Sequence, residues 1–175
     1  MSPAGPLIIA VRTSFVMAIA LVFQLGIAPR FELFGVQGDL MLLVAIAAGL
    51  AAGPDRGATI GFLAGVAYDL NRTTPFGLSA LTYALVAYAV GSLQDSVLRV
   101  AWWIPVGTAV AASVAGVILY GVLGTVVGED LVSGSLLKVA LLVGLLNAVA
   151  APAVVRAMRW ATGAADGART RAIYR

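Results

Sequence analysis

The polar residues that could carry chemistry are few, and they form no catalytic set. The 175-residue sequence has no histidine and no cysteine. It therefore lacks the commonest general base, thiol nucleophiles, disulfides and the usual zinc ligands. It also has no phosphate-binding glycine loop, so we expect no enzymatic activity, no cofactor and no metal site. Asp39, Asp69 and Asn147 lie in or beside apolar segments, where hydrogen bonding is the chemistry open to them.

A row of small residues leads to one of these carboxylates. Gly57, Gly61 and Gly65 recur every four residues, and the next step of four is Asp69. Residues four apart share nearly one helix face, so the glycines predict a flat surface for close helix packing. This surface contacts either another helix of the chain or a helix of a partner protein. We expect the Asp69 carboxylate to lie near a membrane surface, hydrated or accepting hydrogen bonds from the turn at 71–74.

The composition is that of an integral membrane protein. The chain is 61% hydrophobic and 11% charged, whereas soluble domains are about 45–50% apolar and about 25% charged. The pI of 9.7 does not indicate nucleic acid binding, because the basic residues do not gather on a soluble face. We expect one membrane domain over residues 1–162. A mobile basic tail over residues 163–175 would follow it and contact lipid head groups.

Six membrane helices are predicted, from apolar runs that approach the roughly 20 residues needed to cross a bilayer. They cover approximately residues 7–28, 36–52, 58–70, 75–93, 102–127 and 135–159. The first is longer than the apolar core of a signal peptide, about 7–15 residues, so we expect it to be retained. The second and third are short and share one tight turn. A re-entrant hairpin is the alternative to two separate spans.

Helix-end and kink signals accompany these segments. Thr74 is a suitable cap, and Pro75 suits the first turn of the fourth helix, close to Gly77. In the sixth helix, Pro152 removes one backbone donor, and Asn147 is placed to hydrogen-bond to a neighbouring helix. We expect Asn147 and Pro152 to brace the bundle, with a hinge as the alternative.

The basic residues predict the orientation. An even number of spans places both termini on one side, and the cytoplasmic side is favoured by the excess of basic residues there. With that orientation, eight of the 11 Lys and Arg residues lie at or near the cytoplasm: Arg12, Arg56, Arg99, Arg156, Arg159, Arg169, Arg171 and Arg175. The other three face outward: Arg30, Arg72 and Lys138.

Two stretches resemble the rod shape-determining protein MreD family. Residues 36–93 show that family's Asp-Leu helix entry, Gly-Phe-x-x-Gly followed by Asp, and Pro-x-Gly-hydrophobic helix start. The matching residues are Asp39-Leu40, Gly61-Phe62, Gly65, Asp69, Pro75, Gly77 and Leu78. Residues 141–160 are a looser match that includes Asn147 and Pro152. Gly38 is a departure, because a proline often precedes the Asp in the family.

The resemblance implies a non-enzymatic scaffold in the bacterial inner membrane that supports peptidoglycan synthesis along the lateral wall. It implies binding to an MreC-like single-span protein. Through that protein it implies association with an MreB-like filament and a glycosyltransferase–transpeptidase pair. It also implies a six-helix bundle similar to the substrate-binding subunits of vitamin transporters.

Such a transporter subunit, of the energy-coupling-factor type, is the alternative function. It would need a polar pocket within the bundle. The polar candidates are sparse: Thr59, Ser79, Thr82, Thr108, Ser113 and Asn147. Tyr83 and Tyr88 are expected to pack rather than to contact a ligand. We therefore favour the scaffold.

Overall fold

The chain is all helical over the residues that the structure describes. The computed structural model describes residues 5–72, 75–93, 104–129 and 134–163. The elements in these ranges are α1 (Pro6–Gly26), the 3-10 turn η1 (Ala28–Arg30), α2 (Leu40–Ala52), α3 (Pro54–Asp69), α4 (Leu78–Ser92), α6 (Ile104–Val126) and α7 (Leu136–Ala161). No strand occurs within these ranges, which confirms the predicted all-helical class for this part of the chain.

Helix length separates the elements into two groups. Among the described helices, α1, α6 and α7 are long and apolar enough to cross a membrane. α2 and α4 are apolar but have only 13 and 15 residues. Each is therefore about 20 Å long, whereas the hydrocarbon core is about 30 Å thick. The predicted character of a helical membrane protein is confirmed, and the count of six spans stays a prediction.

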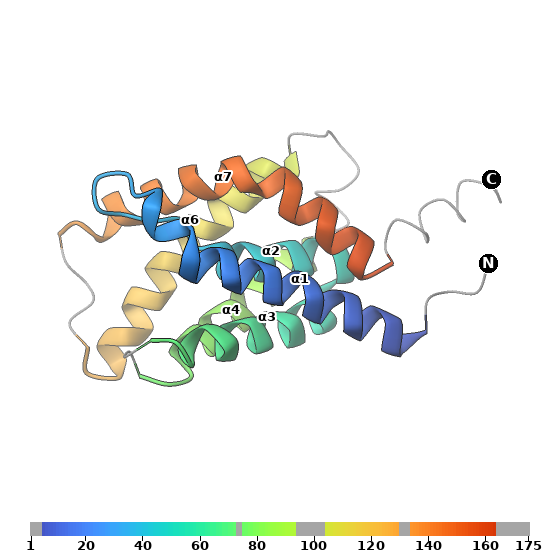
Figure 1. The fold of residues 1–175 in the computed structure, drawn as a ribbon. Coiled ribbons are helices and arrows are strands. Elements are labelled where there is room, and N and C mark those ends of the chain that lie inside the picture. Colours follow the sequence, from blue (N-terminus) through green and yellow to red (C-terminus); the bar gives the residue numbers. More distant parts are fainter. Residues whose placement is uncertain (1–4, 73–74, 94–103, 130–133, 164–175) are drawn as a thin grey trace.

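α2 lies at the centre of the bundle. It contacts each of the other five helices and lies between them in Figure 1. Every residue from Met41 to Ala51 is buried. A helix that is apolar on all sides is stable only when it is surrounded, and the sequence LMLLVAIAAGLAA has no polar face. The short α2 is therefore the core around which the longer helices pack.

The two ends of the bundle differ. The start of α1 and the end of α7 lie at one end, which we call the terminal end, and the loop of residues 27–39 lies at the opposite end, the loop end (Figure 1). At the terminal end, the Arg12 guanidinium carbon lies 4.8 Å from the centre of the Trp160 ring. This cation–π contact joins α1 to α7.

The glycine row of α3 packs against α2 and α4 of the same chain. A Cβ atom at Gly57 would lie 2.6 Å from the Cα of Gly49 in α2. A Cβ atom at Gly61 would lie 2.7 Å from a carbonyl oxygen of α4, and one at Gly65 would overlap the backbone of Ala80. The row is therefore filled by the chain's own helices. The alternative interpretation, a free groove for a partner helix, is corrected by this close internal packing.

Two helices begin at different residues from those predicted, because of local capping. α2 begins at Leu40 rather than near residue 36, since Asp39 is its N-cap and accepts a hydrogen bond from the first turn. α3 begins at Pro54 rather than near residue 58. Gly53 has a φ of 84° and turns the chain directly out of α2, and a proline suits the first turn of the next helix.

The fourth helix also begins later than predicted. α4 starts at Leu78, and its N-cap is Gly77 with a φ of 97°. Pro75 therefore precedes the helix instead of occupying its first turn, and Thr74 lies outside the described residues. In α7 the helix continues without a break through Pro152, whose side chain is exposed.

Replacing Gly65 by alanine should destabilise the bundle. The added Cβ would overlap the backbone of Ala80, which no side-chain rotation can relieve. We expect the free energy of unfolding of the detergent-solubilised protein to fall by about 1–3 kcal/mol. Gly107→Ala is the matched control. No atom lies within 4 Å of a Cβ at Gly107, so its unfolding midpoint should be unchanged or higher. Equal midpoints for the two variants would contradict this account of the glycine row.

Candidate functional site

The start of α2 is capped by side chains from two other helices and by its own N-cap residue. The first N–H groups of a helix have no partner within it, and α2 begins inside the bundle. The Leu40 N–H donates to Gln24 Oε1 over 2.8 Å, and the Asp39 N–H donates to Asn147 Oδ1 over 3.0 Å. The Leu42 N–H donates to Asp39 Oδ1 over 2.9 Å. These acceptors, Gln24, Asp39 and Asn147, are here called the α2 cap cluster.

The same cluster ties the surrounding helices together. Gln24 of α1 donates through Nε2 to the Gly38 carbonyl oxygen over 3.0 Å. Asn147 of α7 donates through Nδ2 to the Asp39 carbonyl oxygen and to Ser113 Oγ of α6, each over 3.0 Å. Gln24, Asn147 and Ser113 are all buried. The Asn147 amide thus links α7 both to α6 and to the start of α2.

Asp39 also binds the hydroxyl of Tyr83. The Tyr83 O–H, from α4, donates to Asp39 Oδ2 over 2.6 Å. Both Asp39 oxygens therefore accept a hydrogen bond, one from the α2 backbone and one from α4. A phenol donating to a carboxylate makes a short, strong hydrogen bond. Tyr83 is buried, as a packing residue would be, and it has this bonding role in addition.

Asp69 caps a second buried helix. Its Oδ2 accepts from the N–H groups of Gly77 (2.9 Å) and Ala80 (3.3 Å), and its Oδ1 accepts from the Ser79 N–H (3.3 Å). The side chain is only 2% exposed. The sequence-based expectation was a hydrated carboxylate or one bonded to the turn at 71–74. The structure shows neither for the described part of that turn, because the carboxylate is buried and bonded to N–H groups at the start of α4. It lies instead at the positive, donor-rich start of α4.

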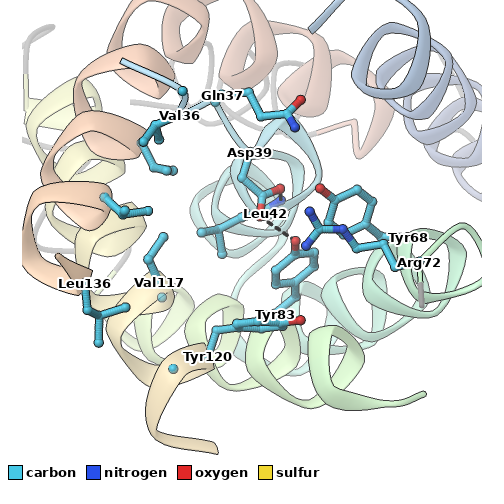
Figure 2. A pocket seen from close by; sticks show the side chains of 16 residues that line it. Val36, Gln37, Asp39, Leu42, Tyr68, Arg72, Tyr83, Val117, Tyr120 and Leu136 are labelled. Carbon is cyan, nitrogen blue, oxygen red and sulfur yellow. Dashed lines mark hydrogen bonds between the residues drawn. The ribbon is translucent and has the colours of Figure 1, made fainter. Parts of the chain in front are cut away.

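A cavity of about 350 Å³ lies at the loop end. We call it the loop-end cavity. Its polar lining comes from Gln37, Asp39, Tyr68, Arg72, Tyr83 and Tyr120, and its aliphatic lining includes Val36, Leu42, Val117, Leu136, Val139 and Val143. Figure 2 shows these side chains surrounding the cavity, with Asp39 and Tyr83 joined by their hydrogen bond. Val117 and Leu136 lie on one side of the space, and Tyr68 and Arg72 lie on the other.

The polar side of the cavity is an aromatic stack with a cation on it. The Tyr68 and Tyr83 rings are stacked, with centroids 6.2 Å apart and planes inclined by 23°. The Arg72 guanidinium carbon lies 4.8 Å from the centre of the Tyr68 ring. In Figure 2 the Arg72 side chain reaches toward Asp39 and Tyr83. Stacking on an aromatic face orients the planar guanidinium while its N–H donors stay available at the edge.

The residues singled out from the sequence lie in different places. Asp39 lines the cavity, and Asn147 lies behind it in the α2 cap cluster. Asp69 and Gly77 lie at the α3–α4 contact. Asp39 and Asp69 share no hydrogen bond within the described part of the chain, because each caps a different helix. The sequence therefore located the structural polar residues, but it did not locate the cavity.

Four residues of this region were missed in the sequence: Gln24, Tyr68, Arg72 and Tyr120. Tyr68 and Arg72 are four residues apart, but Arg72 lies beyond the end of α3, so their contact depends on the turn that follows the helix. Gln24 is an amide in an otherwise apolar segment, which is a signal for a buried partner. No such signal marks Tyr120, because only the packing of α6 brings it to the cavity.

Removing the Asn147 amide should destabilise the protein. In Asn147→Leu, the N–H and carbonyl oxygen of the half-buried Asp39 lose their side-chain partner. We expect the free energy of unfolding in detergent to fall by about 2 kcal/mol or more. Asn71→Leu is the control, because Asn71 makes its side-chain bond to Ala67 on the surface. The free energy of unfolding of that variant should lie within about 0.5 kcal/mol of the wild-type value. If Asn147→Leu lowered the free energy of unfolding no more than Asn71→Leu does, Asn147 would not act as a stabilising cap of α2.

The comparisons with known proteins identify a family. The family model for the rod shape-determining protein MreD matches residues 7–159. No curated protein and no solved structure matches the chain at the threshold applied. The family match spans all the described helices almost completely, including Asp39, Asp69 and Asn147. The chain therefore belongs to the MreD family of rod shape-determining proteins.

Proposed function

We propose that this protein is a non-enzymatic scaffold in the bacterial inner membrane that supports peptidoglycan synthesis along the lateral wall. Membership of the MreD family carries this proposal, since it implies a role in rod-shape determination and wall elongation. The organisation of the polar groups supports it. Asp39, Asp69 and Asn147 are occupied in capping buried helices, which is a structural task.

The proposed topology is a single domain over residues 1–162 with six spans and both termini in the cytoplasm. In support, Arg12 and Arg159 lie near the terminal end, and Arg30, Arg72 and Lys138 belong to the loop end. The positive-inside rule then makes the terminal end cytoplasmic. Arg99, Arg169, Arg171 and Arg175 lie outside the described residues. With this orientation, the loop-end cavity faces the outside of the cell.

An MreC-like single-span protein is the proposed partner. An MreB-like filament and the glycosyltransferase–transpeptidase pair would belong to the same assembly. Because the glycine row is filled, we place the partner's helix in a groove between α1 and α7. This α1–α7 groove has a volume of about 330 Å³. It is lined by Val16, Ile19, Ala20, Phe23, Leu40, Val44, Ala150, Ala153, Val154 and Ala157.

Two features of the groove suit a transmembrane helix. Ala150, Ala153 and Ala157 lie on one face of α7 and leave room for the close backbone approach on which helix association in lipid depends. α1 is the least buried of the long helices, with only 6% of its most apolar stretch buried in the bundle. A helix lying in the groove would cover α1 on its exposed side and complete the packing around α2.

A vitamin-transporter subunit is the second candidate function, and one observation favours it. Such a subunit needs a polar pocket within the bundle, and the loop-end cavity is polar on one side. The family match favours the scaffold. The assembly in which the protein is found distinguishes the two functions.

The first test is to purify the tagged protein in mild detergent from its native membranes and to identify the co-purifying proteins by mass spectrometry. We expect a single-span MreC-like protein together with wall synthases. A mock-tagged strain provides the control. Recovery of an ATPase pair with a coupling membrane subunit would instead establish the transporter function and overturn the scaffold.

Cysteine cross-linking tests the α1–α7 groove. The chain has no cysteine, so Ala153→Cys introduces a unique site. Combined with single cysteines along the partner's transmembrane helix, it should form disulfides at positions spaced by three or four residues. Leu85→Cys is the matched control, because Leu85 is 45% exposed on α4, away from the groove. Disulfides from Leu85→Cys and none from Ala153→Cys would show that the partner helix contacts the α4 face and not the α1–α7 groove.

A further inference from the structure

The loop-end cavity has hydrogen-bond donors that the protein leaves unused. The Arg72 guanidinium stacks on Tyr68, and no ion pair or side-chain hydrogen bond joins it to another described residue. A guanidinium offers five N–H donors in a plane. Tyr120, which also lines the cavity, has a buried hydroxyl without a hydrogen-bond partner among the described residues. Arg72 is an exposed residue, so its donors are accessible both to solvent and to a ligand. Leaving the buried Tyr120 hydroxyl unpaired is unfavourable, so this group favours an added acceptor.

The acidic group in the cavity does not supply that acceptor. Asp39 already accepts from the Leu42 N–H and from the Tyr83 hydroxyl, and it makes no ion pair with Arg72. Its negative charge nevertheless lies on the same side of the cavity as Arg72. One cation beside one carboxylate accommodates a singly charged anion better than a doubly charged phosphate, because each added negative charge is repelled by Asp39.

The opposite side of the cavity selects for an apolar body. Val117 of α6 and Leu136 of α7 lie across the cavity from Arg72 and Tyr68 in Figure 2. Val139 and Val143 of α7 also line the cavity. The volume of about 350 Å³ lies at the small end of the range for ligand pockets, about 300–1,000 Å³. A few precisely placed polar groups opposite an apolar wall are the usual design of a small-molecule site.

We propose that the loop-end cavity binds a small amphipathic carboxylate. The carboxylate accepts hydrogen bonds from Arg72 and Tyr120, and the apolar body lies against Val117, Leu136 and Val139. Arg72 is the anchor because its planar donor fork matches a carboxylate in two parallel hydrogen bonds. The inference does not depend on the scaffold function, since it concerns binding by the protein alone.

The test measures binding of hexanoate by the full chain in phosphatidylcholine nanodiscs, with isothermal titration calorimetry. Hexanamide, which has the same shape without the charge, is the probe control. We expect wild type to bind hexanoate at least about tenfold more tightly than hexanamide. Arg72→Gln should weaken hexanoate binding by at least about tenfold and remove the preference for the acid. Arg30→Gln is the matched variant, because Arg30 is exposed at the same end but does not line the cavity.

A second variant separates binding from folding. Val117→Phe keeps Arg72 and fills the cavity from its aliphatic side, so it should abolish hexanoate binding while leaving the unfolding midpoint near that of the wild type. Equal hexanoate affinity in wild type, Arg72→Gln and Val117→Phe, or no binding in wild type, overturns the proposal. Native mass spectrometry of the purified protein identifies the natural occupant. A retained phospholipid that Arg72→Gln releases would also overturn the assignment to a small molecule. None of these outcomes depends on whether a partner protein is captured.

Discussion

The structure depends on one constraint: α2 begins half-buried within the bundle, beside the loop-end cavity, and its first N–H groups need hydrogen-bond acceptors. A helix end buried without partners is unfavourable by several kcal/mol in an apolar medium. The α2 cap cluster meets this constraint with one side chain from α1, one from α7 and the helix's own N-cap. Because these acceptors come from different helices, capping α2 also determines how α1 and α7 lie against it.

The same solution occurs a second time at α4. Asp69, at the end of α3, accepts from three N–H groups at or near the start of α4. The glycine row then allows α3 to approach α2 and α4 closely. The most distinctive polar and small residues of the chain therefore serve the packing of its three short helices. Helix capping and close packing therefore account for the positions of these polar and small residues.

The two surfaces proposed to contact other molecules border this packed core. The α1–α7 groove is apolar and lies along two long helices, which suits a helix within the membrane. The loop-end cavity combines a stacked guanidinium with an aliphatic wall, which suits a small amphipathic molecule. Gln24 and Asn147 connect them physically, since both hold the start of α2 and come from the helices that form the groove.

The sequence by itself determined the helical membrane class, the family and the polar residues of structural importance, because apolar runs, glycine spacing and isolated polar residues are local signals. Helix starts were predicted less well. Asp39 and Gly77 move the starts of α2 and α4 along the chain through capping geometry, which a hydropathy pattern does not contain. Only the tertiary structure decided that α3 packs against its own neighbours, and that Asp69 reaches the start of α4. It alone brought Tyr68, Arg72, Tyr83 and Tyr120 around one cavity. The reason is physical: these contacts join residues from separate helices, and their positions follow from how the helices pack rather than from any spacing along the chain.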